Sequence, residues 1–264
     1  MSDSRKFHFV IMAAQRKGVV NPLAESAGVS HKCLIEMSGK PLIEHVARAV
    51  SDSGLASKIS VSIEEPSALD GVAYVNGLKD GGLLRIVPSG DNLFESVAGA
   101  LSGPEDFPAI ITTADNVLLT PEMLRHFCKS APDYDAALAM IDKETLLAKY
   151  PDGQRNFHKF RDGEFSNCNL YAITSPEALS AARVFEGGGQ FRKSLKRVVK
   201  AFGLVNMIAY RYAWFTRDRA IARIGKRFNI NTGAVDMPFP EAPIDVDNER
   251  TMKVAADILA ARYA

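Results

Sequence analysis

The chain is predicted to fold as an α/β protein, a three-layer α/β/α sandwich around a mostly parallel sheet. Two observations favour this class. Apolar runs of strand character alternate with helical patterns through about residue 140, as successive strand–helix–strand units do. The run 108–113, Pro-Ala-Ile-Ile-Thr-Thr, is typical of a central parallel strand that is covered on both faces. With 264 residues and 47% hydrophobic content, the chain can bury one sizeable core, and we expect a single domain over residues 1–264.

The first half of the chain supplies most of the predicted sheet. Strands are expected, in order, at residues 7–14, 58–63, 84–87, 108–113 and 135–141. Helices are expected at residues 41–51, at 92–101 and from residue 120 onwards. Pro41 and Pro121 suit the first turn of their helices, where a missing N–H does no harm. Leu42, Val46 and Val50 then share one face of the first helix, which should point to the core.

The second half is less regular. Residues 158–160 and 165–173 predict two strands joined by a hairpin turn at Arg161-Asp162-Gly163. Further helices are expected after Ser175-Pro176, at residues 217–228 and at residues 248–263.

Charge is unevenly distributed along the chain. The net charge is +1, but residues 190–228 hold eleven Lys or Arg and one acid, Asp218, so this part carries +10 and the remainder −9. The segment predicts a basic helical insert within the single domain, with an anionic partner. Its longest apolar run, 201–210, spans ten residues, whereas a membrane-spanning helix needs about 20.

The cysteine pattern predicts a reducing compartment. Cys33, Cys128 and Cys168 are odd in number and far apart, without a Cys-x-x-Cys pair. Neither a disulfide framework nor a zinc ribbon is expected, and a cytoplasmic location fits.

The strongest functional pattern follows the first predicted strand. Residues 12–18, Met-Ala-Ala-Gln-Arg-Lys-Gly, leave that strand, and residues 31–43, HKCLIEMSGKPLI, lead into the next helix. This is the carboxyl edge of a parallel sheet, where α/β folds bind ligands. Backbone N–H groups with Arg16, Lys17 and Lys32 suit a polyphosphate. From spacing alone, a solvated loop with scattered lysines is the alternative.

These two stretches resemble the signature of the MobA-like nucleotidyltransferases, which have a glycosyltransferase-A-type fold. The family pattern is LAAGxGxRM, a spacer, then PKxLxxxxGKPLI, and HKCLIEMSGKPLI follows its second half closely. In the first half, Gln15, Lys17 and Val19 replace the two glycines and the arginine. The resemblance implies a Rossmann-like sheet of the nucleotide-diphospho-sugar transferase type. It also implies that Lys32 is a catalytic residue that contacts phosphate, while Lys40 is structural.

The resemblance further implies a nucleotide-binding site. Residues 89–97, Ser-Gly-Asp-Asn-Leu-Phe-Glu-Ser-Val, are similar to the GGxxRxxSV segment beside the nucleobase in cytidylyltransferases, with Leu93 at the arginine position. An ordinary loop and helix start is the alternative reading. The expected nucleotide-binding residues are Ala13, Ala14, Gln15, Lys17, Gly18, Lys32, Gly90, Ser96, Thr113 and Ala114.

Acidic residues at two places predict a metal site. Asp115 follows the strand at 108–113, and a carboxylate there suits a hard divalent cation; capping of the next turn is the alternative. The family has a magnesium-binding aspartate at this point. Ile-Asp-Val-Asp-Asn at 244–248 resembles the family segment DIDTPED, so Asp247 is expected to complete the Mg²⁺ site, with Asp245 in reserve. Helix capping by Asp247 or Asn248 is the alternative.

Together these patterns predict a Mg²⁺-dependent nucleotidyltransferase. It would move an NMP group from an NTP, with CTP slightly favoured, to a small phosphorylated or lipid-precursor acceptor and release pyrophosphate. Lys32 and Asp115 would be catalytic, and the expected acceptor residues are Asn169, Arg192 and Lys196. Peripheral contact with an anionic membrane, at its inner face, is a secondary hypothesis, and nucleic acid is not an expected partner.

Two alternatives remain from the sequence. A sugar-nucleotide-dependent glycosyltransferase would need an Asp-x-Asp pair near the middle of the chain, where residues 114–116 supply only one acid, and the GKPLI segment argues against it. A non-catalytic nucleotide-binding regulator is favoured by Gln15, Lys17 and Val19 in the signature loop.

Overall fold

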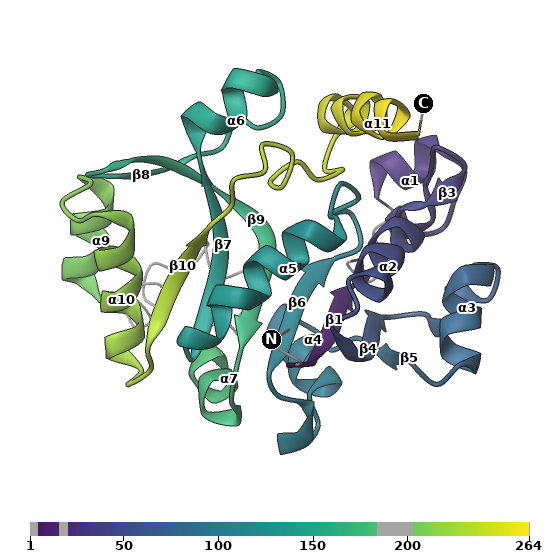
Figure 1. Cartoon of the computed structure of the whole chain (residues 1–264), viewed down its shortest axis with the longest axis horizontal. Coiled ribbons are helices and arrows are strands. Elements are labelled where there is room, and N and C mark those ends of the chain that lie inside the picture. Colours follow the sequence, from purple (N-terminus) through teal and green to yellow (C-terminus); the bar gives the residue numbers. More distant parts are fainter. Residues whose placement is uncertain (1–4, 16–20, 184–202, 264) are drawn as a thin grey trace.

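A computed structural model of the chain describes residues 5–15, 21–183 and 203–263 (Figure 1). The strands are β1 (Phe7–Met12), β2 (Glu36–Met37), β3 (Lys40–Pro41), β4 (Ala56–Ile63), β5 (Leu84–Pro88), β6 (Ala109–Thr113), β7 (Ala136–Asp142), β8 (His158–Phe160), β9 (Gly163–Ile173) and β10 (Thr232–Asp236). The α-helices are α1 (Pro22–Ser26), α2 (Leu42–Asp52), α3 (Ala73–Asp80), α4 (Leu93–Ala100), α5 (Pro121–Ser130), α6 (Lys143–Lys149), α7 (Pro176–Ala182), α9 (Leu204–Arg211), α10 (Arg217–Arg227) and α11 (Glu249–Tyr263). Short 3₁₀ turns are η1 (Lys32–Leu34), η2 (Pro66–Leu69), η3 (Pro104–Asp106) and η4 (Ala131–Asp133).

One sheet organises the described part of the chain. Its order is β10-β7-β9-β6-β1-β4-β5, with β8 paired to β9. The strands β6, β1, β4 and β5 are parallel neighbours, and β10 is parallel to β7. The long strand β9 is antiparallel to both β6 and β7 and separates them. The predicted α/β class with a mostly parallel sheet is confirmed, although the alternation of strand and helix patterns gave no sign that β9 enters the sheet there.

Helices cover both faces of this sheet, which gives the three predicted layers. Successive residues of β1 point to opposite faces: Phe9 and Ile11 belong to the core cluster under α2 and α5, and Val10 belongs to the cluster under α4 and α7. The strand is buried on both sides, as its unbroken apolar sequence predicts. A third cluster packs α11 against the chain that follows β6.

Most predicted helix starts are confirmed. Asn92, Thr120 and Ser175 each accept a hydrogen bond from the backbone N–H three residues on, at 3.0 to 3.2 Å. Pro41 differs from the prediction. It is the cap residue before α2 and also ends the short strand β3, so the helix starts at Leu42.

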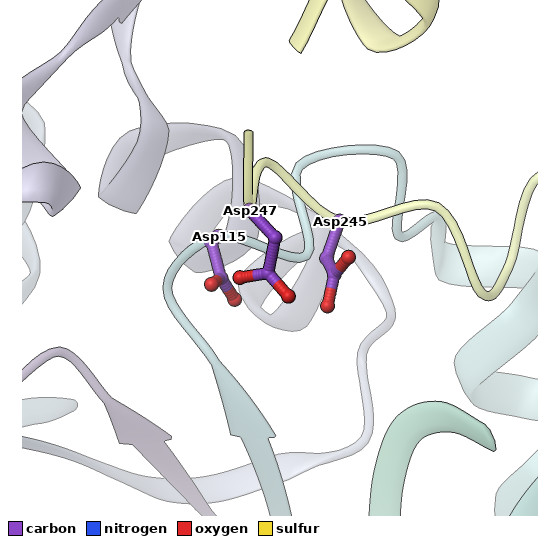
Figure 2. A group of neighbouring side chains, drawn as sticks. All are labelled: Asp115, Asp245 and Asp247. Atoms are coloured by element: carbon purple, nitrogen blue, oxygen red, sulfur yellow. The ribbon is translucent and has the colours of Figure 1, made fainter. Parts of the chain in front are cut away.

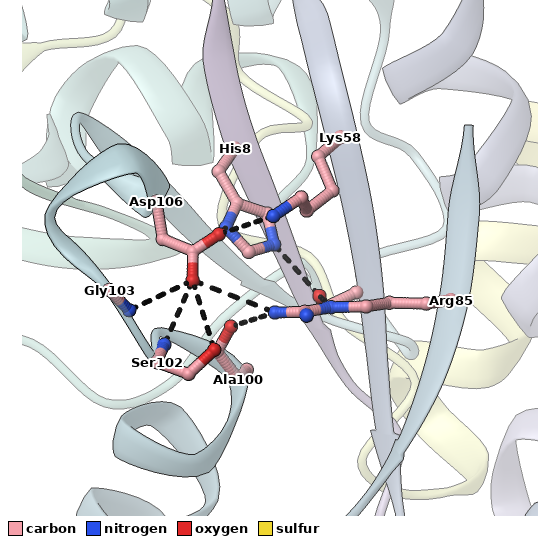
Figure 3. A network of polar contacts seen from close by, with 8 residues as sticks. His8, Lys58, Arg85, Ala100, Ser102, Gly103 and Asp106 are labelled. Carbon is pink, nitrogen blue, oxygen red and sulfur yellow. Dashed lines mark hydrogen bonds and ion pairs between the residues drawn. The ribbon is translucent and has the colours of Figure 1, made fainter. Parts of the chain in front are cut away.

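A buried polar network fixes the amino-terminal edge of the sheet, opposite the ends where β1 and β6 lead into loops (Figure 3). The fully buried Asp106 carboxylate accepts hydrogen bonds from Lys58 Nζ at 2.6 Å and from the Ser102 N–H at 2.8 Å. His8 Nδ1 lies 3.0 Å from the same carboxylate, and Arg85 Nη2 lies 3.7 Å from it. Side chains of β1, β4 and β5 therefore converge on the loop that precedes β6.

The basic part of the chain is described from residue 203 onwards. Helix α10 packs on β10, and α9 lies beside it at the end of the sheet away from β5 (Figure 1). The helix predicted at 217–228 is confirmed, with α10 ending at Arg227. The acceptor candidates Arg192 and Lys196 lie outside the described residues. Among the described helices, none is both long and apolar enough to span a membrane.

Candidate functional site

Three carboxylates meet at the carboxyl edge of the sheet (Figure 2). Asp115 follows β6, and Asp245 and Asp247 come from the segment between β10 and α11. Each side chain offers an oxygen within 4.8 Å of the others. The Val246 N–H donates to the Asp115 carbonyl at 3.1 Å, which holds the two segments together.

The sequence around residue 245 explains why both of its acids reach the site. Ile244 and Val246 are fully buried in the cluster beneath α11. Between them the chain turns tightly, with the Asp247 N–H donating to the Asp245 carbonyl at 3.1 Å, and both carboxylates face Asp115. Asn248 caps α11 by accepting the Thr251 N–H at 3.2 Å. Of the two capping candidates, Asn248 is therefore the one that caps the helix, while the Asp247 carboxylate faces Lys32.

Lys32 bridges two of the three carboxylates. Its Nζ is 2.5 Å from Asp115 Oδ2 and 2.9 Å from Asp247 Oδ1. Burial opposes the ammonium form, but the charges and hydrogen bonds of Asp115 and Asp247 outweigh it and raise the pKa of Lys32. Two acids that lie 83 and 215 positions after Lys32 in the sequence thus share its ammonium group.

Asp245 is the most enclosed of the three acids. Burial, followed by the charges of Asp247 and Asp115, raises its pKa to about 7. Asn169 Nδ2 donates to Asp245 Oδ2 at 2.6 Å. Asn169 has a φ of 49°, a conformation that asparagine tolerates better than most residues, and it stands where the pairing of β9 with β7 shifts register. The acceptor candidate Asn169 therefore contacts the acidic cluster.

The cluster fits a hard divalent cation. Its donors are carboxylate oxygens, the ligands that Mg²⁺ and Ca²⁺ prefer. Asp115 Oδ1 is buried and has no hydrogen-bond partner in the described structure, so it does not cap the following turn. The three acids and Lys32 together carry a negative net charge that a cation would offset.

The neighbouring residue Asn116 does not join the acids. It is buried, and its Nδ2 donates to Thr112 Oγ1 at 3.3 Å and to the Cys168 carbonyl at 3.2 Å. The second and third acids of the site, Asp245 and Asp247, come from the far end of the chain, where they flank Val246.

The predicted nucleotide-binding residues of two strand ends lie side by side. Ala13, Ala14 and Gln15 follow β1, while Thr113 ends β6 and Ala114 follows it. The Ala114 N–H donates to the Met12 carbonyl at 2.9 Å. Lys17 and Gly18 lie outside the described residues.

Glu64, at the end of β4, was missed by the sequence reasoning. Its carboxylate accepts the Gln15 N–H at 3.1 and 3.3 Å, and His31 Nε2 lies 3.3 Å from it. The backbone N–H of Gln15 therefore faces a carboxylate. Only its position after a predicted strand could have drawn attention to Glu64.

The loop after β5 is held by its own side chains. The Gly90 N–H donates to Ser96 Oγ at 3.0 Å, and that hydroxyl donates to the Asn92 carbonyl at 2.9 Å. A Cβ at Gly90 would stand 2.3 Å from the Glu95 side chain, so only glycine fits this close approach. Ser96 thus shapes the predicted nucleobase loop through its buried hydroxyl.

Lys40 is separate from the acids. Its Nζ lies over the Tyr263 ring, 4.7 Å from the centroid. It pairs with Met37 across a two-residue hairpin whose turn residues, Ser38 and Gly39, both have positive φ. The second half of the signature thus separates into Lys32, which contacts two acids, and a turn that leads into α2.

A family model described as the MobA-like NTP transferase domain matches residues 24–202, more than half of the chain. The chain belongs to this family. The matched residues of this MobA-like NTP transferase include Lys32, Asp115 and the segment at 31–43 that resembles the family signature. No curated protein sequence matches this MobA-like transferase.

Solved structures share its fold. A hypothetical transferase from Thermus thermophilus has a TM-score of 0.74 and 23% identity, over 94% of this chain and 99% of the other. The 4-diphosphocytidyl-2C-methyl-D-erythritol synthase of Anaerococcus prevotii has a TM-score of 0.58 and 12% identity, over 98% and 100%. A CMP:2-keto-3-deoxy-manno-octonic acid synthetase solved with CTP has a TM-score of 0.57 and 12% identity, over 97% and 100%. At these identities the likeness establishes the fold alone. Nucleotidyl transfer is the activity that the family supports.

Proposed function

We propose that this protein transfers an NMP group from an NTP to a small anionic acceptor, with Mg²⁺ as cofactor and pyrophosphate as the second product. The observation that carries the proposal is the contact of Lys32 with Asp115 and Asp247. One ammonium and a group of carboxylates in a single partly enclosed site suit a triphosphate and its cation.

Each of these side chains has a distinct task in the proposal. Asp115 and Asp247 would hold the cation, which when bound neutralises the charge on the phosphates. Lys32 would exchange its carboxylate partners for phosphate oxygens, since a cation competes with its ammonium for the same acids. An acceptor oxygen would attack the α-phosphorus in line with the departing pyrophosphate, a transfer that depends mainly on positioning and charge.

CTP is the first nucleotide to test. Two structures of similar fold carry cytidylyl or CTP in their descriptions, and the loop of Gly90 and Ser96 lies at the end of β5 on the same sheet edge. The phosphates would have to approach the Gln15 amide past the Glu64 carboxylate. Because Glu64 is negatively charged and would repel phosphate there, a non-catalytic nucleotide-binding regulator is the competing hypothesis.

The acceptor side is proposed at Asn169. Its hydrogen bond to Asp245 places it beside the acids, and the basic residues Arg192 and Lys196 would add charge for a phosphorylated or lipid-precursor acceptor. A glycosyltransferase is less well supported, because Asn116 is turned inward. The free cysteines Cys33, Cys128 and Cys168 agree with the proposed cytoplasmic location.

The test is pyrophosphate release. The protein is incubated with each of the four NTPs, Mg²⁺ and a panel of phosphorylated alcohols and sugars. Acceptor-dependent release would support the proposal and name the nucleotide. Binding of an NTP without pyrophosphate release with any acceptor would favour the regulator. In a parallel assay with sugar nucleotides in place of the NTPs, release of a nucleoside diphosphate would favour the glycosyltransferase.

A further inference from the structure

Exposed apolar side chains are concentrated at one place on the molecule. Among the described residues, eight large apolar or aromatic side chains are exposed, and six of them lie within residues 204–214. Tyr210 turns back to β8, where its hydroxyl lies 2.7 Å from His158 Nδ1. The other five form what we call the α9 patch: Leu204, Val205, Ile208, Tyr212 and Trp214.

The α9 patch occupies the outer face of its helix. Leu204, Ile208 and Tyr212 follow each other at intervals of four, one above the other on a helix. Ala209 of the same helix is buried, and Asn206 on its far side accepts a hydrogen bond at Oδ1 from Arg223 Nε of α10 at 2.9 Å. A surface helix of a soluble protein normally points its apolar face inward, so an exposed apolar face on α9 departs from the usual pattern.

Aromatic rings continue the patch beyond the helix. The rings of Tyr212 and Trp214 stack, with centroids 6.2 Å apart. Tyrosine and tryptophan are the side chains that sit best at the boundary between an apolar phase and water.

Basic side chains lie on the neighbouring helix α10. Arg219, Arg223 and Arg227 follow at intervals of four, with Lys226 beside them. These four residues are the basic stripe. Arg223 contacts α9 through Asn206, and the Arg227 guanidinium lies against Gly203 at the start of α9.

Acids are rare within residues 203–228. The one acid there, Asp218, pairs with Arg217 at 2.8 Å. Arg217 is also bonded to Asp236 of β10, and its N–H donates to Asp162 at 2.9 Å. The two helices are thus fastened to β10 and to the β8–β9 hairpin, while their outer faces meet solvent.

We propose that the α9 patch and the basic stripe form a surface that binds the headgroup region of an anionic membrane. An apolar face with aromatic rings, bordered by Lys and Arg, is the composition of helices that lie in a membrane interface. The charge decides between membrane and protein partners: a positive helix beside an exposed apolar face complements anionic lipid headgroups above acyl chains. The proposal goes beyond nucleotidyl transfer and does not depend on it.

The test is co-sedimentation of the full chain with vesicles of phosphatidylcholine, alone or mixed with phosphatidylglycerol. The charge variant combines Arg219→Gln with Lys226→Gln, and its matched control combines the exposed pair Lys79→Gln and Lys253→Gln. Tyr212→Ser is matched by Tyr263→Ser, since both tyrosines are exposed to a similar extent. A third variant, Val205→Ser with Ile208→Ser, removes apolar area. Melting curves establish that every variant is folded, as exposure of these side chains predicts.

We expect binding that requires phosphatidylglycerol and weakens with salt. Two lost charges, at about 1 kcal/mol each, should weaken partitioning about thirtyfold, and the controls should bind as the unchanged chain does. Absence of binding to the mixed vesicles, or equal binding by patch and control variants, would overturn the proposal. A second result would also overturn it. If the chain does not bind vesicles but forms a dimer in light scattering, and the Val205/Ile208 variant disrupts that dimer, the patch joins two copies of the chain.

Discussion

At the scale of single residues, the site depends on how a few charges share a small volume. Lys32 holds Asp115 and Asp247 together, while Asp245 stands behind them with a pKa raised to about 7. Removal of any one charge changes both the attraction for a cation and the partners left to the others.

The first prediction concerns Asp115. Asp115→Asn keeps the size of the side chain and removes one charge from the proposed cation site, so turnover should fall about 100-fold or more. Pyrophosphate release measures it, and the melting curve checks the fold. Nearly normal turnover in a folded variant would remove Asp115 from the mechanism.

The second prediction compares two lysines of the same motif. Lys32→Ala should reduce pyrophosphate release strongly, because Lys32, unlike Lys40, contacts two of the acids. Lys40→Ala is the matched control: Lys40 lies over Tyr263, so its loss should leave most activity. A larger loss in the Lys40 variant would reverse the assignment.

At the scale of elements, the buried network of Asp106 joins β1, β4 and β5 to the loop before β6. Burial opposes the charge of Asp106, but the bond from Lys58 and the Ser102 N–H lower its pKa to about 2. The network lies at the far edge of the sheet from the acids, so its changes should affect stability more than catalysis.

The third prediction tests that network. Asp106→Asn should lower the free energy of unfolding by about 2–3 kcal/mol, since Lys58 and Arg85 lose their counter-charge but still reach solvent. Chemical denaturation measures the effect. Asp257→Asn, which breaks an exposed pair with Lys253, should change little. Equal effects of the two substitutions would show that the network adds no stability.

The fourth prediction concerns pH. Burial, with the charges of Lys58 and Arg85, lowers the pKa of His8 to about 4 against the pull of Asp106. The unfolded chain therefore binds this proton more readily than the folded protein. The stability from His8 is complete above about pH 6.5 and is lost as the pH falls towards 4, by at most about 1.4 kcal/mol per pH unit.

Denaturation curves between pH 7 and 4 test this expectation. His8→Gln should make the unfolding free energy less dependent on pH. Some dependence will remain, because burial also lowers the pKa of His45. An unchanged slope in the variant would show that His8 does not titrate as proposed.

At the scale of the whole molecule, the site exists only in the folded chain. Lys32, Asp115 and Asp247 belong to segments far apart in the sequence and meet through the packing of η1, the β6 loop and the start of α11. A ligand held by all three should therefore bind the folded state alone.

The fifth prediction follows from this. Mg²⁺ with CTP at about one hundred times the dissociation constant should stabilise the fold by about 2.7 kcal/mol, a rise in Tm of about 5–10 °C. Asp247→Asn should abolish most of the rise without lowering the Tm of the free protein greatly, because Asp247 is largely exposed. An equal rise in the variant would exclude Asp247 from the ligand site.

The sequence by itself determined the class of fold and the main candidates of the site. Strand and helix periods record which faces are buried, and caps such as Thr120 record where helices begin. These are local properties, so β1, β6 and α5 could be predicted from short windows. The motif around Lys32 and the positions of Asp115 and Asp247 likewise follow from residue order.

Only the tertiary structure decided which segments meet. Strand β9 enters between β6 and β7, and its pairing depends on partners far along the chain. The turn of Asp245 towards the acids depends on burial of Ile244 and Val246 beneath α11, and the contact of Glu64 with Gln15 depends on the alignment of β4 with β1. The outward apolar face of α9 is a similar case, because the period of a helix shows that it has a face but not which way that face points.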